Sequence, residues 1–119
     1  MKNLANLFKA LSDETRLAMM NMLLRHGELC VCDFVETLGI TQSKASRHLR
    51  YLLNAGLVQN RREGVWMYYR VVRKPDDRMK HVISSLRRIL PGKEHDDLVT
   101  RLDRWLASKP RAGQACRAE

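Results

Sequence analysis

A three-residue gap, Gly39-Ile40-Thr41, constrains the fold of this 119-residue chain more than any other feature. On each side of it lies a short segment whose apolar residues recur at intervals of three and four, the spacing of an amphipathic helix. Glycine commonly ends a helix, and threonine is a good N-terminal cap for the next one. Two short helices joined by so tight a turn form a helix-turn-helix. The apolar residues of the pair are Val31, Phe34, Val35 and Leu38, then Ala45, Leu49, Leu52 and Leu53.

Further helices are predicted before and after this pair. The segments with helical apolar spacing are residues 4–11, 13–26, 79–89 and 98–106. Ser12 is the expected cap of the second of these segments, with Asp13 and Glu14 in its first turn. Pro75 precedes the third segment and Pro91-Gly92 ends it.

Two strand-like runs directly follow the paired helices. Residues 57–62 and 65–72 meet at Glu63-Gly64, where glycine permits a tight turn. A hairpin attached in this way forms the wing of a winged helix-turn-helix. We therefore predict a mainly α fold with a small β-hairpin.

The positive charge of the chain is concentrated in this central part. The net charge is +9. Residues 41–74 hold eight Lys or Arg residues against the single acid Glu63. Such a concentration is typical of a protein that binds a polyanion.

The second helix of the pair carries polar side chains suited to reading DNA. Its non-apolar sides present Gln42, Ser43, Lys44, Ser46, Arg47 and Arg50, and it holds no acid. Short hydrogen-bonding groups and cations recognise base edges and phosphates. The sequence therefore predicts that this helix binds double-stranded DNA and that the basic hairpin reaches the neighbouring backbone.

We expect residues 1–107 to form one DNA-binding and dimerisation domain, and residues 108–119 a flexible C-terminal tail. A core this small cannot cover the apolar stripes of both the first helix and the helix over residues 79–89, so a homodimer is expected. No apolar run approaches the roughly 20 residues that span a bilayer. Three cysteines do not make a disulfide framework. We expect a cytoplasmic protein without a membrane partner.

Two cysteines lie at the start of the helix-turn-helix, in Glu28-Leu29-Cys30-Val31-Cys32-Asp33. A pair of thiols is a soft-metal ligand. Residues two apart on an α-helix point about 200° away from each other. Both thiols can therefore hold one ion only if Cys30 precedes the helix or if binding unwinds its first turn. The alternative is that they are two small buried apolar residues.

These motifs closely resemble the arsenical-responsive repressors of the ArsR-type metalloregulator family. The resemblance is carried by residues 28–33, Gln42-Ser43-Lys44-Ala45-Ser46-Arg47-His48-Leu49, Asn54-Ala55-Gly56-Leu57-Val58, Leu11-Ser12-Asp13-Glu14-Thr15-Arg16-Leu17 and Arg61-Arg62-Glu63-Gly64-Val65-Trp66. It implies a homodimeric winged-helix repressor that binds operator DNA and is released by trivalent arsenic or antimony, with no organic cofactor.

The resemblance also implies functional residues. The DNA contacts fall on Gln42, Ser43, Lys44, Ser46, Arg47 and His48 in the helix, and on Arg61 and Arg62 in the wing. The metalloid ligands fall on Cys30 and Cys32. Several family members have a third cysteine where this chain has Val35. A third ligand could come from Cys116, of the same chain or its partner, or from a small thiol or water.

Other classes of protein fit less well. A cysteine-dependent arsenate reductase needs an arginine at a fixed distance after its nucleophile, but Glu36 and Leu38 stand six residues after Cys30 and Cys32. The chain also lacks a glycine-rich phosphate loop, so no enzyme is predicted. A DNA-packaging protein would explain the charge but not the cysteines. A winged-helix repressor that responds to thiol oxidation, cadmium or zinc stays open as the alternative.

Overall fold

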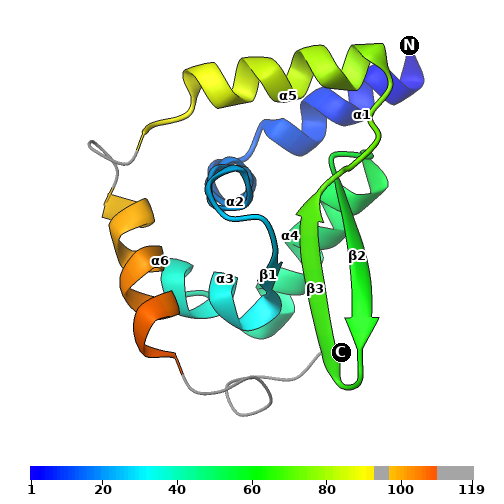
Figure 1. The fold of residues 1–119 in the computed structure, drawn as a ribbon. Coiled ribbons are helices and arrows are strands. Elements are labelled where there is room, and N and C mark those ends of the chain that lie inside the picture. Colours follow the sequence, from blue (N-terminus) through cyan, green and yellow to red (C-terminus); the bar gives the residue numbers. More distant parts are fainter. Residues whose placement is uncertain (93–96, 110–119) are drawn as a thin grey trace.

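The predicted helices and hairpin are all present in the computed structural model, which describes residues 1–92 and 97–109 (Figure 1). The expected tail, with Cys116, lies outside these residues from residue 110 onward. The elements are α1 (Lys2–Leu11), α2 (Glu14–Arg25), β1 (Leu29–Cys30), α3 (Val31–Leu38), α4 (Gln42–Asn54), β2 (Val58–Glu63), β3 (Trp66–Val71), α5 (Asp77–Ile89) and α6 (Asp97–Ser108). Together they form a winged helix-turn-helix.

Helix α2 lies at the centre of the molecule. Figure 1 shows it end-on, with α1 and α5 on one side and α3, α4 and α6 on the other. Apolar spacing in the sequence places Leu17, Met20 and Leu24 on one narrow stripe of α2. That stripe is too narrow, because elements packed around α2 bury more of its circumference. The buried residues of α2 are Met19, Met20, Asn21, Met22 and Leu23.

The cap of α2 differs from the expectation. Asp13, not Ser12, is the N-cap, and its Oδ2 accepts a hydrogen bond of 3.0 Å from the Arg16 backbone N–H. The Ser12 hydroxyl instead donates to the Lys9 carbonyl at 2.8 Å and so completes the end of α1. The prediction was wrong by one residue because two potential caps are adjacent and α1 uses the first.

The sheet contains a strand that the sequence did not predict. Its order is β1-β3-β2, with both pairings antiparallel. Cys30 of β1 pairs with Tyr68 of β3, and Arg61 of β2 pairs with the other edge of Tyr68. The hairpin turns at Gly64, whose φ of 62° favours glycine. The start of the helix-turn-helix is thus hydrogen-bonded directly to the wing.

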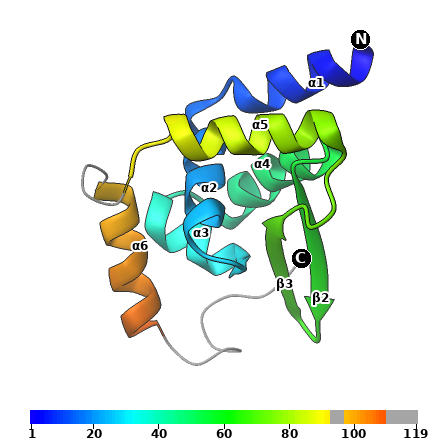
Figure 2. The ribbon, with the colours of Figure 1, turned by 45° about the horizontal axis from the view of Figure 1, so that its top comes forward.

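Helix α6 packs against α2 and α3, at the opposite side of the molecule from the hairpin (Figures 1 and 2). Leu98, Val99 and Leu102 are its buried residues. The His26 Nε2 atom lies 3.0 Å from Asp103 Oδ1 and joins the end of α2 to α6. Every helix among the described residues is too short or too polar to cross a membrane.

Candidate nucleic-acid interface and thiol site

Helix α4 presents a positively charged face to solvent. The Thr41 hydroxyl caps the helix, accepting a hydrogen bond of 3.1 Å from the Lys44 backbone N–H. Ala45, Leu49 and Leu52 are buried, which fixes the rotation of the helix. The exposed residues of α4 on its other sides include Ser43, Lys44, Arg47 and Arg50, while Gln42 and Ser46 are half-buried. The helix has no acid, so this face can approach phosphates without repulsion.

His48 lies apart from these exposed side chains. Its Nδ1 atom is 3.0 Å from Arg16 Nη1 and 3.8 Å from Asp13 Oδ2, and its side chain is only 15% exposed. Burial lowers the pKa of His48, and the Asp13 charge opposes that shift in part. His48 therefore joins α4 to the beginning of α2. Arg16 strengthens this junction, because its guanidinium stacks over the Tyr51 ring at 4.2 Å.

The two wing arginines lie on opposite faces of β2, as neighbouring strand residues do. Arg61 donates hydrogen bonds of 2.7 and 2.9 Å to the two carboxylate oxygens of Glu28, and one of 2.9 Å to Glu63. Its guanidinium also stacks on Tyr68 at 4.7 Å. These contacts raise the pKa of Arg61. They lower the pKa of Glu28, and the hydrogen bonds from Arg61 are the largest cause of that shift. Arg62 is exposed.

The cysteines occupy two different backbone environments. Cys30 is the N-cap of α3, with an extended backbone at φ −92° and ψ 168°, and Cys32 lies in the first helical turn. Of the two arrangements that allow both thiols to hold one ion, the structure therefore has the one in which Cys30 precedes the helix. Both side chains are buried, at 7% and 2% exposure. Cys30 is a free thiol and Cys32 is disulfide-bonded.

Asp33 controls the surroundings of Cys30. Its carboxylate is buried, and Oδ2 accepts a hydrogen bond of 2.8 Å from the Cys30 backbone N–H. Burial and, next, the negative charge of Asp33 raise the pKa of the Cys30 thiol, and the helical N–H groups lower it less. Cys30 is accordingly held as a neutral thiol at neutral pH.

Sequence reasoning missed the roles of several residues at this site. Asp33 stands three residues after the N-cap, a spacing typical of a capping box, so its contact with Cys30 could have been found. Glu28 and Trp105 gave no such signal, because their partners Arg61 and Asp33 lie 33 and 72 residues away in sequence.

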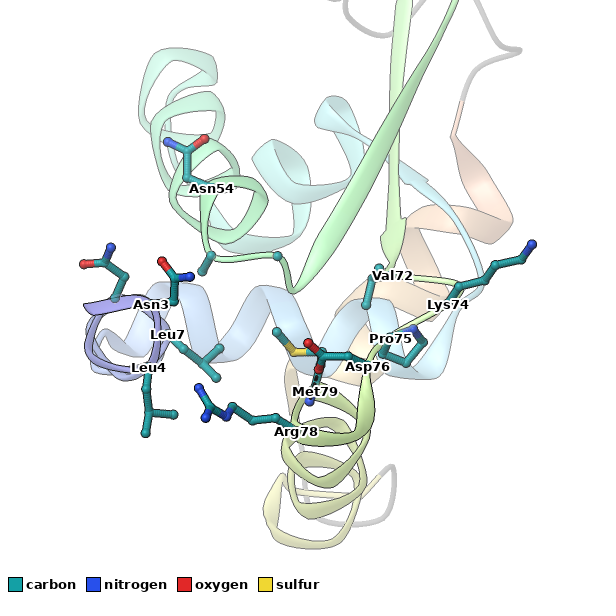
Figure 3. A pocket seen from close by; sticks show the side chains of 13 residues that line it. Asn3, Leu4, Leu7, Asn54, Val72, Lys74, Pro75, Asp76, Arg78 and Met79 are labelled. Atoms are coloured by element: carbon teal, nitrogen blue, oxygen red, sulfur yellow. Dashed lines mark hydrogen bonds between the residues drawn. The ribbon is translucent and has the colours of Figure 1, made fainter. Parts of the chain in front are cut away.

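A hollow of about 430 Å³ lies elsewhere, between α1, the end of α4 and the start of α5 (Figure 3). Figure 3 shows Asn3, Leu4 and Leu7 on one side of it and Arg78 and Met79 on the other. Its lining includes no residue of α3 and neither Cys30 nor Cys32. It is therefore separate from the thiol site.

A helix-turn-helix with an acid-free second helix and a basic hairpin beside it defines a winged helix-turn-helix DNA-binding protein. Residues 13–60 match the family model described as "Bacterial regulatory protein, arsR family". The chain belongs to the ArsR family, whose members are transcription regulators and not enzymes.

Several curated relatives are similar to this chain. The uncharacterized HTH-type transcriptional regulator MJ1325 of Methanocaldococcus jannaschii is 42% identical over 79 residues, which are 66% of this chain and 85% of that protein. The arsenic resistance transcriptional regulator ArsR1 of Pseudomonas putida is 48% identical over 64 residues, 54% of this chain. The CadC homolog of Staphylococcus aureus, a cadmium resistance regulatory protein, is 40% identical over 83 residues, 70% of this chain and 66% of that protein. The match spans only 50% of the length of ArsR1.

Several solved structures are also similar to this chain in fold and sequence. HlyU from Vibrio cholerae superposes with a TM-score of 0.63 at 32% identity, covering 75% of this chain and 92% of that one. The homodimeric winged helix-turn-helix domain of Mb0332 from Mycobacterium bovis has a TM-score of 0.62 at 28% identity. The match covers 74% of this chain and 78% of that domain. The antimony-specific transcriptional repressor AntR has a TM-score of 0.56 at 29% identity. The match covers 69% of this chain and 71% of AntR.

Proposed function

We propose that this protein is a cytoplasmic, metalloid-responsive transcriptional repressor. It binds double-stranded operator DNA as a homodimer and leaves the DNA when trivalent arsenic or antimony binds Cys30 and Cys32. One observation supports this most strongly. Cys30 is both the register partner of Tyr68 in the wing and the N-cap of α3, the helix that packs against α4. A change at the thiols therefore acts on both elements that face the DNA.

The proposed DNA contacts begin at the N-terminus of α4. Gln42 and Ser43 reach base edges, Ser46 lies one turn further, and Lys44 and Arg47 bind phosphate or guanine. Arg62 contacts the backbone from the wing. His48 and Arg61 belong to the set implied by the resemblance, but each already has protein partners. Within the proposal these two side chains hold α4 and the wing in place.

The proposed dimer surface combines α1 and α5, which lie side by side in both views (Figures 1 and 2). Phe8 of α1 is 61% exposed and Ile89 of α5 is 73% exposed. A contiguous patch of exposed apolar side chains marks an interface, and within the proposal these two side chains belong to one such patch. The related Mb0332 domain is homodimeric. To read two half-sites one turn of DNA apart, such a dimer needs its two α4 helices about 34 Å apart.

The donor set suits a thiophilic ion. Two thiolates bind soft metals and metalloids in preference to hard cations. Because Cys30 is a neutral thiol, Cd²⁺ or Zn²⁺ must displace its proton, so the affinity for these cations should rise with pH. Trivalent arsenic binds from As(OH)₃, so each thiol proton leaves with a hydroxide as water and no net proton is released. The proposal concerns the reduced protein. The third ligand is Cys116, which lies outside the described residues, or a small thiol or water.

Relatives support more than one inducer. One is named for arsenic, one for cadmium and one structural neighbour for antimony. The alternative functions are therefore a response to cadmium or zinc, or to oxidation of the same thiols. All of them use Cys30 and Cys32, and they differ in the chemical signal.

A titration distinguishes these functions. The reduced protein is bound to a fluorescent duplex selected from random sequences, and arsenite, antimonite, Cd²⁺, Zn²⁺ and, in metal-free buffer, peroxide are added separately. Release by arsenite or antimonite is expected. A hundredfold loss of affinity corresponds to a coupling free energy of about 2.7 kcal/mol. The Cys30→Ser/Cys32→Ser double variant should bind the duplex normally and stay bound, whereas Cys116→Ser should have a smaller effect. Arsenite-driven release in the double variant would refute the proposal.

A further inference from the structure

Residues 28–33, which hold Cys30 and Cys32, form the thiol segment. Helix α6 is connected to this segment through the buried carboxylate of Asp33. The Trp105 indole N–H donates a hydrogen bond of 2.8 Å to Asp33 Oδ1, and Lys109 Nζ lies 3.1 Å from the same oxygen. The other oxygen, Oδ2, accepts the backbone N–H of Cys30. Asp33 is 1% exposed, so these donors replace the water that it would otherwise bind.

A buried carboxylate is stable only while its partners stay in place. Removing one donor from such a group leaves charge without compensation, which costs more than the bond itself contributes. Asp33 therefore favours the arrangement in which α6 lies against the start of α3. Since Asp33 also holds the backbone of Cys30, the position of α6 and the conformation of the thiol segment are linked.

A second polar contact holds α6 against the end of α2. The His26–Asp103 contact of 3.0 Å joins it to the end of α2. The helix contributes none of the proposed DNA contacts and none of the exposed apolar residues of α1 and α5. The contacts of Trp105 and Lys109 with Asp33, and of Asp103 with His26, instead join it to the chain between the end of α2 and the first turn of α3.

We propose that α6, together with Lys109 directly after its end, is a clasp on the thiol segment, in which Trp105 and Lys109 hold Asp33 and thereby limit how fast a thiol-reactive species reaches Cys30. Trp105 and Lys109 are positioning residues, because each holds Asp33 Oδ1 while the other oxygen of Asp33 holds the Cys30 backbone. The clasp deepens the proposed function by adding control of access to the same thiols. A buried thiol reacts through a locally opened state, so its rate reports how readily the clasp opens.

The test measures alkylation of Cys30 by iodoacetamide in full-length protein. The background is Cys32→Ser/Cys116→Ser, which leaves Cys30 as the single thiol of the three in the chain. Trp105→Phe keeps most of the ring packing but loses the N–H donor, and Lys109→Met loses the charge. The Lys109 charge also lowers the pKa of the Cys30 thiol, so rates are compared per thiolate, from the pH dependence of alkylation in each variant. Each substitution should then speed alkylation about tenfold or more, the effect of losing a hydrogen bond to a charged group.

Matched variants separate the clasp from general destabilisation. Lys109→Arg should restore a slow rate, and Arg104→Met, which removes an exposed cation of the same helix, should leave the rate unchanged. Amide exchange in α2 and α4 should stay as slow as in the background protein. The clasp is refuted if Trp105→Phe and Lys109→Met leave the rate unaltered, if Arg104→Met matches them, or if α2 and α4 loosen in parallel.

A spectroscopic measurement gives independent evidence. The chain has two tryptophans, Trp66 and Trp105, and hence two indole N–H signals in an NMR spectrum. Asp33→Asn and alkylation of Cys30 should each move the Trp105 signal and leave that of Trp66 in place. An unmoved Trp105 signal would refute the link. Neither experiment uses DNA or a metalloid, so failure of the clasp is distinguishable from failure of the proposed function.

Discussion

Arg61 of the wing donates two hydrogen bonds to the carboxylate of Glu28, at 2.7 and 2.9 Å. Glu28 lies two residues before Cys30, so this ion pair joins the thiol segment to the hairpin. The sheet register reinforces the connection, because Cys30 and Arg61 pair with opposite edges of Tyr68. An arginine held in this way is less available to a phosphate.

Glu28→Gln should therefore release Arg61 toward DNA. We expect tighter binding to non-specific duplex and a steeper salt dependence, by about one unit in the slope of log K against log salt if Arg61 gains one phosphate. Fluorescence anisotropy over a series of salt concentrations measures both. Glu63→Gln, which removes the more exposed partner of Arg61, is the control and should have a smaller effect. An unchanged slope for Glu28→Gln would contradict this role of the ion pair.

Substitution of Arg47 and substitution of Arg62 should weaken DNA binding in different ways. Arg47→Ala should cost about 1–3 kcal/mol on the selected duplex with relaxed sequence preference, if the side chain reads a base. Arg62→Ala should weaken binding to all sequences alike and flatten the salt dependence. Competition binding with selected and scrambled duplexes separates the two outcomes. Arg101→Ala, an exposed cation of α6, should change neither, and equal losses in all three variants would indicate only general electrostatics.

Replacing the exposed apolar residues of α1 and α5 should produce a monomer. In Phe8→Glu/Ile89→Glu, a buried carboxylate would oppose any interface formed there. Sedimentation at micromolar concentration should show a dimer for the wild type and a monomer for the variant, with circular dichroism unchanged. Val65→Glu, at a half-exposed apolar position on the hairpin, should remain dimeric. A wild-type monomer would rule out this surface as the dimer interface.

Stability should fall in acid through two carboxyl groups. The Arg16 backbone N–H lowers the pKa of Asp13 and the Arg61 guanidinium lowers that of Glu28, from ordinary values of 3.8 and 4.5. The unfolded chain then binds more protons than the folded one. Their contribution is present above pH 4.5 and is lost as pH falls through the lowered values. Urea midpoints between pH 3 and 7 should drop less in Asp13→Asn/Glu28→Gln, and a parallel drop in both proteins would contradict the assignment.

The local elements followed from the sequence alone. Apolar spacing located the helices and the hairpin because a helix or strand buries one face at a fixed period. Thr41 as a cap and Gly39 as a helix end were confirmed, since each acts on backbone groups within a few residues. The position of the thiols at the start of the helix-turn-helix followed in the same way.

Only the tertiary structure decided which distant groups meet. The two-residue strand β1 exists because β3 lies beside it, and two residues are too few to show a strand period. His48 contacts Arg16, 32 residues away, and Arg61 contacts Glu28 across 33 residues. Asp33 meets Trp105 across 72 residues. The spacing of apolar residues along the sequence determines which face of a helix or strand is buried. The packing of whole helices and strands determines which distant polar side chains come into contact.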